Sequence, residues 1–363
     1  MKKLAVIGAS SGQIPIVRKA IEMGIEVHCF AWEQGAVCKP LCDYFYPISI
    51  FDTDEITAKC RDIGIDGVAT NASEETALAS AVISENLKLN GTPSDVIKKI
   101  QNKREVRRLT SCIDDLSTPL IFDASNIADV KFPCVVKPIK GSAKKGVSFC
   151  NSSDDLTEAI KYAQQYNVEL VIEEYIDGDE YSVESISFHG VHQVVQFTQK
   201  VTSGYPHFVE LEHHQPALLP DSLKDRISKI VDKILNEVEY TDGATHIEIK
   251  IDNDKIYLIE INPRGGGDHI SDTLVGLSTD FDYMRSIIEV SLGNYEFHQV
   301  NQKSYSGILF LNKQNSRIQK YFDCPMAPWM IERHCDSETL RESVSNYDRN
   351  GYLIYSSSNP IHL

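Results

Sequence analysis

The chain has 363 residues, a formal net charge of −16 at pH 7 and 42% hydrophobic residues. That length predicts two or three domains with a substantial core. The acidic balance argues against a nucleic-acid partner, which would need a basic surface. No apolar run reaches the ~18 residues of a membrane span, and the nine cysteines lack framework spacing. We therefore expect a cytoplasmic protein with free thiols and no membrane partner.

Strand and helix patterns alternate through residues 1–92. The expected strands are 4–7, 26–30 and 67–70, and the expected helices are 13–23, 55–63 and 74–87. This alternation predicts a doubly wound parallel sheet. The turn from Gly8 to Gly12 has Ser10 where the dinucleotide fingerprint has a glycine, which disfavours a dehydrogenase. Substrate contact by this turn, or by Asn71 and Ser73, stays open.

Two basic segments follow. A helix at 101–111 carries Lys103, and a buried strand then ends at Lys137. The loop after that strand contains Gly141, Ser142, Lys144 and Gly146. Backbone N–H groups and ammonium groups of this kind can surround phosphates, although Val147 after the last glycine excludes a P-loop. A basic hairpin turn is the alternative.

Residues 168–184 have the pattern strand, connector, strand. A connector between two sheets offers backbone N–H and C=O groups to a purine edge, and an acid shortly after it can accept hydrogen bonds from ribose hydroxyls. An acidic surface loop is the alternative.

The segment 243–270 predicts a β-hairpin whose turn is Asp252-Asn253-Asp254. Strand alternation can bring Glu248, Glu260 and Asn262 onto one face. Two carboxylates and a carboxamide oxygen suit Mg²⁺, which binds few carboxylates together with substrate phosphates. Arg264 and three glycines follow directly, and they suit an anion.

The histidine-rich segment 200–217 has no clear periodicity. We expect a loop that lines an acceptor pocket, with a plain surface loop as the alternative. A metal cluster of His207, Glu210, His213 and His214 is disfavoured, because adjacent histidines lack a matching carboxylate pattern. Amphipathic helices are expected at 222–238 and 280–292, and a β-rich tail without recognisable chemistry from residue 306.

The order of these pieces closely resembles the ATP-grasp superfamily. The motifs in order are Lys103, V-V-K-P with Lys137, G-S-A-K-K-G, E-E-Y-I-D-G-D-E-Y-S-V-E, H-I-E-I-K and E-I-N-P-R. The resemblance covers nearly the whole chain and implies an α/β and α+β fold. Its expected parts are a doubly wound pre-ATP-grasp domain (1–92), linker helices (93–130), a nucleotide-lid subdomain (131–185), a larger catalytic lobe (186–300) and a C-terminal β-rich lobe (301–363).

The resemblance also implies residue roles. The implied ATP-binding residues are Lys103 and Lys137 at the α- and β-phosphates, Gly141, Ser142, Lys144 and Gly146 in the phosphate loop, Glu173 at the adenine amino group, Tyr175 and Ile176 at the purine edge, and Glu180 at the ribose. The implied ligands of two Mg²⁺ ions, with Mn²⁺ as an alternative metal, are Glu248, Glu260 and Asn262. The residues assigned to the substrate are Arg264, Gly266, Gly267, Asp268, His269 and His214. Arg264 and Lys137 are the catalytic candidates.

We therefore expect an ATP-dependent ligase that activates a carboxylate as an acyl phosphate and joins it to an amine. Amino acids are the expected small-molecule partners. One alternative is an ATP-grasp enzyme of the carbamoyl-phosphate or purine-pathway type, and another is a non-catalytic nucleotide-binding regulator. A homodimer is left open as the assembly.

Overall fold

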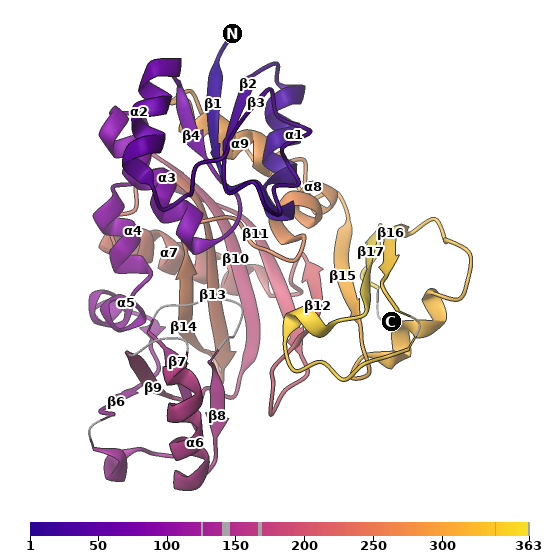
Figure 1. Cartoon of the computed structure of the whole chain (residues 1–363). Coiled ribbons are helices and arrows are strands. Elements are labelled where there is room, and N and C mark those ends of the chain that lie inside the picture. The colour runs from indigo at the N-terminus through magenta and orange to yellow at the C-terminus, as the bar shows by residue number, and fades with distance from the viewer. Residues whose placement is uncertain (125, 140–145, 166–168, 338, 362–363) are drawn as a thin grey trace.

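The computed structural model describes residues 1–124, 126–139, 146–165, 169–337 and 339–361. Three sheets organise this part of the chain: a four-stranded N-terminal sheet, a four-stranded lid sheet and a nine-stranded central sheet. Figure 1 shows the N-terminal sheet at one end of the molecule, the lid at the opposite end and the central sheet between them. Residues of all three parts line one cavity, where the parts meet.

The N-terminal sheet is parallel with strand order β3-β2-β1-β4. Its strands are β1 Lys3–Ile7, β2 Glu26–Phe30, β3 Tyr44–Tyr46 and β4 Gly67–Ala69, and its helices are α1 Ile14–Glu22, α2 Thr53–Ile63 and α3 Glu74–Leu87. Separate apolar clusters cover its two faces, which confirms the doubly wound prediction. One helix on the α1 face, α9 Tyr283–Ser291, comes from the other end of the chain.

The lid follows two short helices and carries the first half of the predicted nucleotide motifs. These helices are α4 Ser94–Ile100 and α5 Lys103–Thr110. The elements of the lid are β6 Ile121–Phe122, β7 Cys134–Pro138, β8 Ser148–Cys150, α6 Ser153–Gln164 and β9 Leu170–Glu174. The strand order is β6-β9-β7-β8. An apolar cluster between α6 and the sheet holds the lid together. Strand β6 joins this sheet although it lies in the segment expected to be linker.

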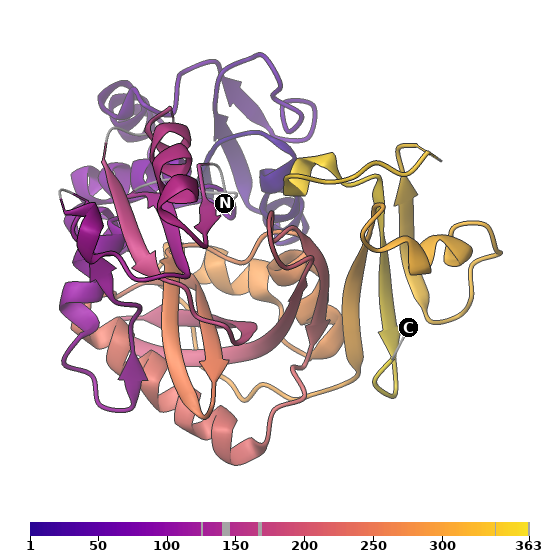
Figure 2. The same ribbon diagram turned by 90° about the horizontal axis from the view of Figure 1, so that it is seen from below.

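The central sheet has the order β16-β17-β15-β12-β11-β10-β13-β14-β5. Its strands are β5 Leu116–Ser117, β10 Asp179–Phe188, β11 Val191–Thr202, β12 Glu210–Gln215, β13 Gly243–Asp252, β14 Lys255–Asn262, β15 Tyr305–Leu311, β16 Met330–Cys335 and β17 Gly351–Ser357. Helix α7 Asp221–Glu237 packs on one face through a large apolar cluster. The tail strands therefore extend the same sheet as the hairpin, as Figure 2 shows from below.

Shorter helical turns connect these elements. They are 3₁₀ turns at Ser11–Gln13, Ile127–Asp129, Ser316–Tyr321 and Asn346–Asp348, a π-helical turn at Ile270–Leu274, and α8 Val275–Ser278. Among the described residues, no helix is long and apolar enough to cross a membrane. All nine cysteines are free thiols, as expected.

A β-bulge in strand β14 decides which of its side chains point away from the core. The ladder with β13 shifts register so that Ile259 has no partner. A bulge of one residue reverses the alternation of the strand. Leu258 before it and Ile261 after it consequently both belong to the apolar core. Glu260 and Asn262 are left on the opposite face, toward a cavity that they line.

A second bulge acts in the same way in strand β12. Leu211 has no partner in the ladder with β11. This places Glu210 on the face that also carries His213, the residue opposite Lys200. His214 lies on the other face, as alternation requires. The segment 200–217 is thus partly strand rather than a loop throughout, which corrects the expectation from its missing periodicity.

Candidate active site

A cavity of about 810 Å³ lies where the N-terminal loops, the lid and the central sheet meet. Its lining has three regions. The lid end is lined by Val135, Val147, Tyr175, Ile176, Phe208 and Ile259. The centre is lined by Lys103, Lys137, Glu248, Glu260, Asn262 and Arg264. The far end is lined by His213, Asp268, His269, Phe310, Arg349 and Tyr352.

The two hairpin acids face each other at the centre. Glu248 is the direct cross-strand partner of Glu260, and His246 is that of Asn262. All four side chains line the cavity. The predicted shared face is therefore correct, and the bulge in β14 lets an otherwise core-facing strand present it.

Cationic groups from earlier segments reach the same centre. Lys103 Nζ lies 2.8 Å from Glu260 Oε1, and Lys137 Nζ lies 2.5 Å from Glu173 Oε2. Arg264 donates to the carbonyl of Gly265 at 2.7 Å and to Asn262 Oδ1 at 3.4 Å. No carboxylate of the described residues forms an ion pair with Arg264, so its charge is available to an anion in the cavity.

Glu173 has a different environment from the one expected for an adenine ligand. Its side chain is 1% exposed and its carboxylate is held by Lys137 and by Arg107, whose Nε donates to Oε1 at 3.0 Å. Although burial raises the pKa of Glu173, these two cations lower it to about 2. The carboxylate therefore anchors Lys137, the lysine predicted to bind phosphate, and the structure gives its adenine role no support.

The lid end of the cavity is apolar and offers backbone groups. Lys250 Nζ donates to the carbonyl of Ile176 at 3.1 Å and lies 5.1 Å from the ring centroid of Tyr175. Tyr175 also meets Phe149 of the lid edge to face, with ring centroids 4.7 Å apart. Glu180, the expected ribose acid, lines the cavity next to this end. This arrangement suits a purine ring, whose faces are apolar and whose edge needs hydrogen bonds.

Part of the phosphate loop lies outside the described residues. This applies to Gly141, Ser142 and Lys144. Gly146 is described and has a φ of +72°, the left-handed region that favours glycine. The predicted phosphate role of these four residues stays a prediction.

The chemistry of the central donors fits Mg²⁺. One oxygen of Glu260 pairs with Lys103, while within the described part of the chain its Oε2 accepts no hydrogen bond. One oxygen of Glu248 pairs with Lys200, and its Oε2 is likewise left for a ligand. Two carboxylate oxygens and the Asn262 carboxamide form a hard oxygen set. No group of three or more His, Cys, Asp and Glu suited to a metal ion occurs in the described segments, including 200–217, so the site rests on two acids and a carboxamide.

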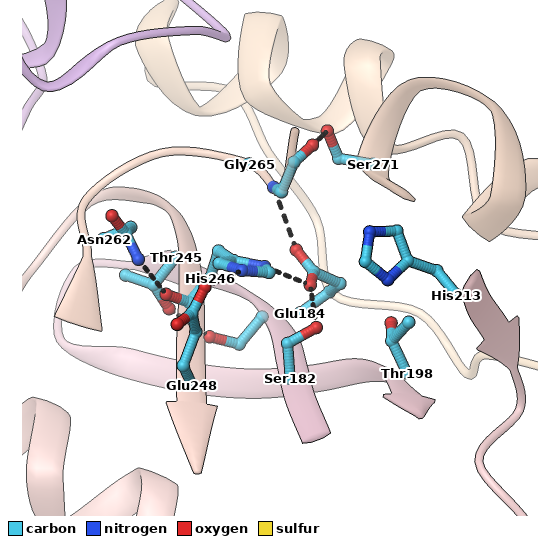
Figure 3. A network of polar contacts seen from close by, with 12 residues as sticks. Ser182, Glu184, Thr198, His213, Thr245, His246, Glu248, Asn262, Gly265 and Ser271 are labelled. Carbon is cyan, nitrogen blue, oxygen red and sulfur yellow. Dashed lines mark hydrogen bonds and ion pairs between the residues drawn. The ribbon is translucent and has the colours of Figure 1, made fainter. Parts of the chain in front are cut away.

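A buried histidine beside Glu248 was missed by the sequence interpretation. Figure 3 shows the Glu184 carboxylate at the centre of a polar network, with the His246 ring on one side. His246 Nδ1 lies 2.6 Å from Glu184 Oε1 and its Nε2 lies 3.2 Å from Glu248 Oε1. Burial lowers the pKa of His246, but Glu184 and Glu248 outweigh burial and raise it to about 9. His246 is therefore a cation that orients both carboxylates.

Glycine is required at positions 265 and 266 after Arg264 because neighbouring side chains pack closely against the backbone there. A Cβ on Gly265 would lie 2.7 Å from Asn71 Oδ1, and one on Gly266 would lie 2.8 Å from His246 Nδ1. The N–H of Gly266 donates to Glu184 Oε2 at 3.0 Å. That N–H is already used within the protein, which corrects the expectation that Gly266 offers it to substrate. A Cβ on Gly267 would meet nothing within 4 Å.

The far end of the cavity is polar and is shared with the tail. Arg349 donates to both oxygens of Asp268, at 2.9 and 2.7 Å, and lies 3.6 Å above the ring centroid of Phe310. His213 Nε2 is 3.7 Å from Asp268 Oδ2. Burial raises the pKa of Asp268, but His213 and Arg349 outweigh it and hold that pKa well below its usual range. The tail thus contributes to the site, contrary to the expectation that it carries no chemistry.

The structure places the two histidines that were assigned to the substrate, His269 and His214, in different surroundings. His269 lines the cavity, next to Asp272 at 3.4 Å. His214 does not line it: its ring bonds Tyr355 at 2.8 Å and Glu212 at 2.9 Å on the other face of β12. His213 occupies the position that was assigned to His214. The structure gives the predicted substrate contact of His214 no support, because the strand directs its side chain away from the cavity.

Comparison with known proteins agrees with this geometry. Residues 130–272 match the ATP-grasp domain. A formate-dependent phosphoribosylglycinamide formyltransferase from Corynebacterium jeikeium is 24% identical over 280 residues, which cover 72% of this chain and 67% of that protein. The uncharacterized protein y4rH from Sinorhizobium fredii is 26% identical over 246 residues, 64% of this chain, and the chain spans only 50% of that relative.

A solved structure shares the fold over nearly the whole length. The L-amino acid ligase from Bacillus licheniformis superposes with a TM-score of 0.82 at 22% identity, covering 99% of this chain and 94% of the ligase. At that identity the likeness establishes the fold. Residues 130–272 are therefore an ATP-grasp domain, within a chain whose overall fold is shared with that ligase.

Proposed function

We propose that this protein joins a carboxylate to an amine through an acyl phosphate, at the expense of ATP, and that both substrates are amino acids. The observation that carries the proposal is the charge arrangement at the centre of the cavity. Lys103 and Lys137 stand beside Glu248, Glu260 and Asn262, and all of them line the cavity that Arg264 also lines. This arrangement suits a metal-bound triphosphate facing a reactive anion.

In the first step a carboxylate oxygen of the substrate attacks the γ-phosphorus, and the bond to ADP breaks. Lys103 and Lys137 bind phosphate oxygens and offset their charge. Arg264, which has no acid partner among the described residues, holds the attacking carboxylate close to the phosphate. Mg²⁺ bound by Glu248, Glu260 and Asn262 would supply further positive charge at the transferring phosphoryl group.

In the second step the amine nitrogen forms a bond to the acyl carbon, and inorganic phosphate leaves. Arg264 stabilises the negative charge that develops on the acyl oxygen. The far end of the cavity, with Asp268, Arg349 and His269, would bind the amine substrate. Its paired charges suit a molecule that carries both an ammonium and a carboxylate, as an amino acid does.

The fold likeness to an L-amino acid ligase supports amino-acid substrates. The likeness to a formate-dependent phosphoribosylglycinamide formyltransferase over 72% of the chain favours a second candidate, the activation of formate for transfer to a ribosylamine derivative. The two candidates share the first step and differ in the acid and in the amine. They are therefore separable by substrate alone.

The test is a screen for ADP release with ATP and Mg²⁺. Pairs of amino acids are compared with formate plus phosphoribosylglycinamide and with bicarbonate. We expect ADP release that requires two amino acids, with amide product confirmed by mass spectrometry. Release with formate and the ribosylamine derivative would favour the second candidate, and tight nucleotide binding without any turnover would identify a regulator instead.

A further inference from the structure

Lys200 of strand β11 is a buried cation surrounded by acids. Its side chain is 4% exposed, and its Nζ lies 2.9 Å from Glu248 Oε1, 3.1 Å from Glu180 Oε1 and 3.3 Å from Glu210 Oε1. The three acids come from three different strands, β13, β10 and β12. All of them line the central cavity.

The strand register explains this convergence. Glu180 is the direct cross-strand partner of Lys200, so both side chains share a face. Glu248 lies one strand further on, where it pairs with Ser182, two residues along from Glu180. Glu210 reaches the same face because the bulge at Leu211 shifts the register of β12.

An ammonium group fits this position because its number of N–H donors and its positive charge both match the three acids. It has three N–H donors and no acceptor, so it can donate one hydrogen bond to each of three carboxylates. Carboxylates crowded in a buried space repel one another strongly, because the interior screens charge poorly. Each acid is therefore held through one oxygen by the same cation.

Two of these acids have expected ligands on two adjoining parts of the nucleotide. Glu180 is expected to hold the ribose, and Glu248 to hold the metal at the phosphates. Their second oxygens have no partner in the described chain. The third acid, Glu210, is tied to the tail through its backbone, whose N–H donates to Asn346 Oδ1 at 3.0 Å.

We propose that Lys200 is a positioning residue for nucleotide binding. It fixes one oxygen of Glu180 and one of Glu248, so that the remaining oxygens point to the ribose hydroxyls and to the metal together. This inference rests on the proposed function for the identity of the ligand, MgATP or MgADP. It predicts that a change at Lys200 alters ribose recognition, although Lys200 contacts the ribose only through Glu180.

The test measures ADP binding by isothermal titration calorimetry, with 2′-deoxy-ADP and 3′-deoxy-ADP as probes. A hydrogen bond to a charged group is worth about 10-fold or more in affinity. We therefore expect the wild-type protein to bind ADP about 10-fold more tightly than at least one deoxy analogue. In Lys200→Met this preference should shrink to less than about 3-fold, and ADP affinity with Mg²⁺ should fall at least 10-fold.

A double-mutant cycle provides the second readout. The measured quantity is the ratio of the affinities for ADP and its deoxy analogue. In a Glu180→Gln background, Lys200→Met should lower this ratio much less than it does in the wild type, because Lys200 and Glu180 act through one contact with the ribose. Lys99→Met is the matched control, since among the described residues that lysine pairs only with Asp95 and Glu239 and does not line the cavity. If Lys200→Met does not fold, Lys200→Gln, which keeps N–H donors without the charge, is measured instead.

The possible outcomes separate this inference from the proposed function. Ribose discrimination that survives in the Lys200 variant, with ADP bound by the wild type, overturns the positioning role alone. Discrimination that is lost in the variant supports the role, whatever the substrate screen gives. A wild-type protein that binds no nucleotide overturns both, and strictly additive effects in the cycle overturn the link through Glu180.

Discussion

Removal of the Glu173 carboxylate is the sharpest test of how the proposed phosphate site is built. Glu173 is buried between Lys137 and Arg107, at 2.5 and 3.0 Å. Its pKa is about 2, against an ordinary value of 4.5. At about 1.4 kcal/mol per pKa unit, this difference corresponds to about 3 kcal/mol of folding free energy at neutral pH. A buried pair broken on one side costs about 3–5 kcal/mol, which agrees.

The assay is thermal unfolding of Glu173→Gln against the wild type. With an unfolding entropy of about 2.1 cal/mol/K per residue over 363 residues, a loss of about 3 kcal/mol lowers Tm by roughly 4 °C. Glu158→Gln is the control, because within the described part of the chain that exposed acid of helix α6 pairs only with Lys161. We expect the control to change Tm by less than about 1 °C.

The pH dependence of the stability difference between the wild type and Glu173→Gln provides a second test of the ion pairs of Glu173. A carboxylate whose pKa is lowered on folding contributes its full stability above the unfolded-state pKa and loses it as the pH falls toward the folded-state value. The stability difference between wild type and Glu173→Gln should therefore be constant from pH 8 to 5 and shrink below about 4.5. A Tm equal to that of the wild type at pH 7 would refute the view that Glu173 compensates two buried cations.

Further variants test the rest of the site. Glu260→Gln should lower the rate of ADP release at least about 100-fold with an unchanged circular dichroism spectrum, because it removes a carboxylate charge that holds the metal at the transferring phosphoryl group. Rates near the wild-type value would disprove the metal-binding role of Glu260. Lys137→Ala should weaken ADP binding at least about 10-fold by calorimetry, and unchanged affinity would contradict a phosphate contact. Gly266→Ala should lower Tm by several degrees, since its Cβ would lie 2.8 Å from His246 Nδ1, whereas Gly267→Ala has space. Equal Tm values for the two glycine variants would contradict the packing argument.

Local patterns were sufficient for the parts of the site that lie close together in sequence. The hairpin acids Glu248 and Glu260 are separated by twelve residues, and alternation around one turn brings them together. The bulge at Ile259 leaves no clear mark in the sequence. In the structure the bulge is recognised from the burial of both Leu258 and Ile261 in one apolar core, since residues three positions apart in a regular strand would lie on opposite faces. The face of the hairpin was thus predictable, and the device that produces it was not.

Contacts between distant strands were not predictable in this way. His213 and His214 are chemically identical neighbours, and the register of β12 decides which of them faces the cavity. Arg349 reaches Asp268 from 81 residues away. The signals that could have found Lys200 and Glu184 are an acid and a lysine within otherwise apolar strands, because a charge in a buried strand requires a partner.

The ion pair between Lys103 and Glu260 has a consequence for the order of binding. Lys103 Nζ and Glu260 Oε1 are 2.8 Å apart, so neither charge is free for a ligand on its own. If a triphosphate bound Lys103 without a metal, the Glu260 carboxylate would face the phosphate anions, which is unfavourable. If a metal bound Glu260 without a nucleotide, it would lie close to the displaced ammonium group of Lys103, which is also unfavourable. Both costs disappear when nucleotide and metal bind together, because each charge then gains an opposite partner. We therefore expect positive cooperativity: Mg²⁺ should tighten ADP binding, and ADP should tighten Mg²⁺ binding by the same factor. In Lys103→Met the factor should fall, since the metal no longer meets a competing cation; an unchanged factor would show that the pair does not govern ligand entry.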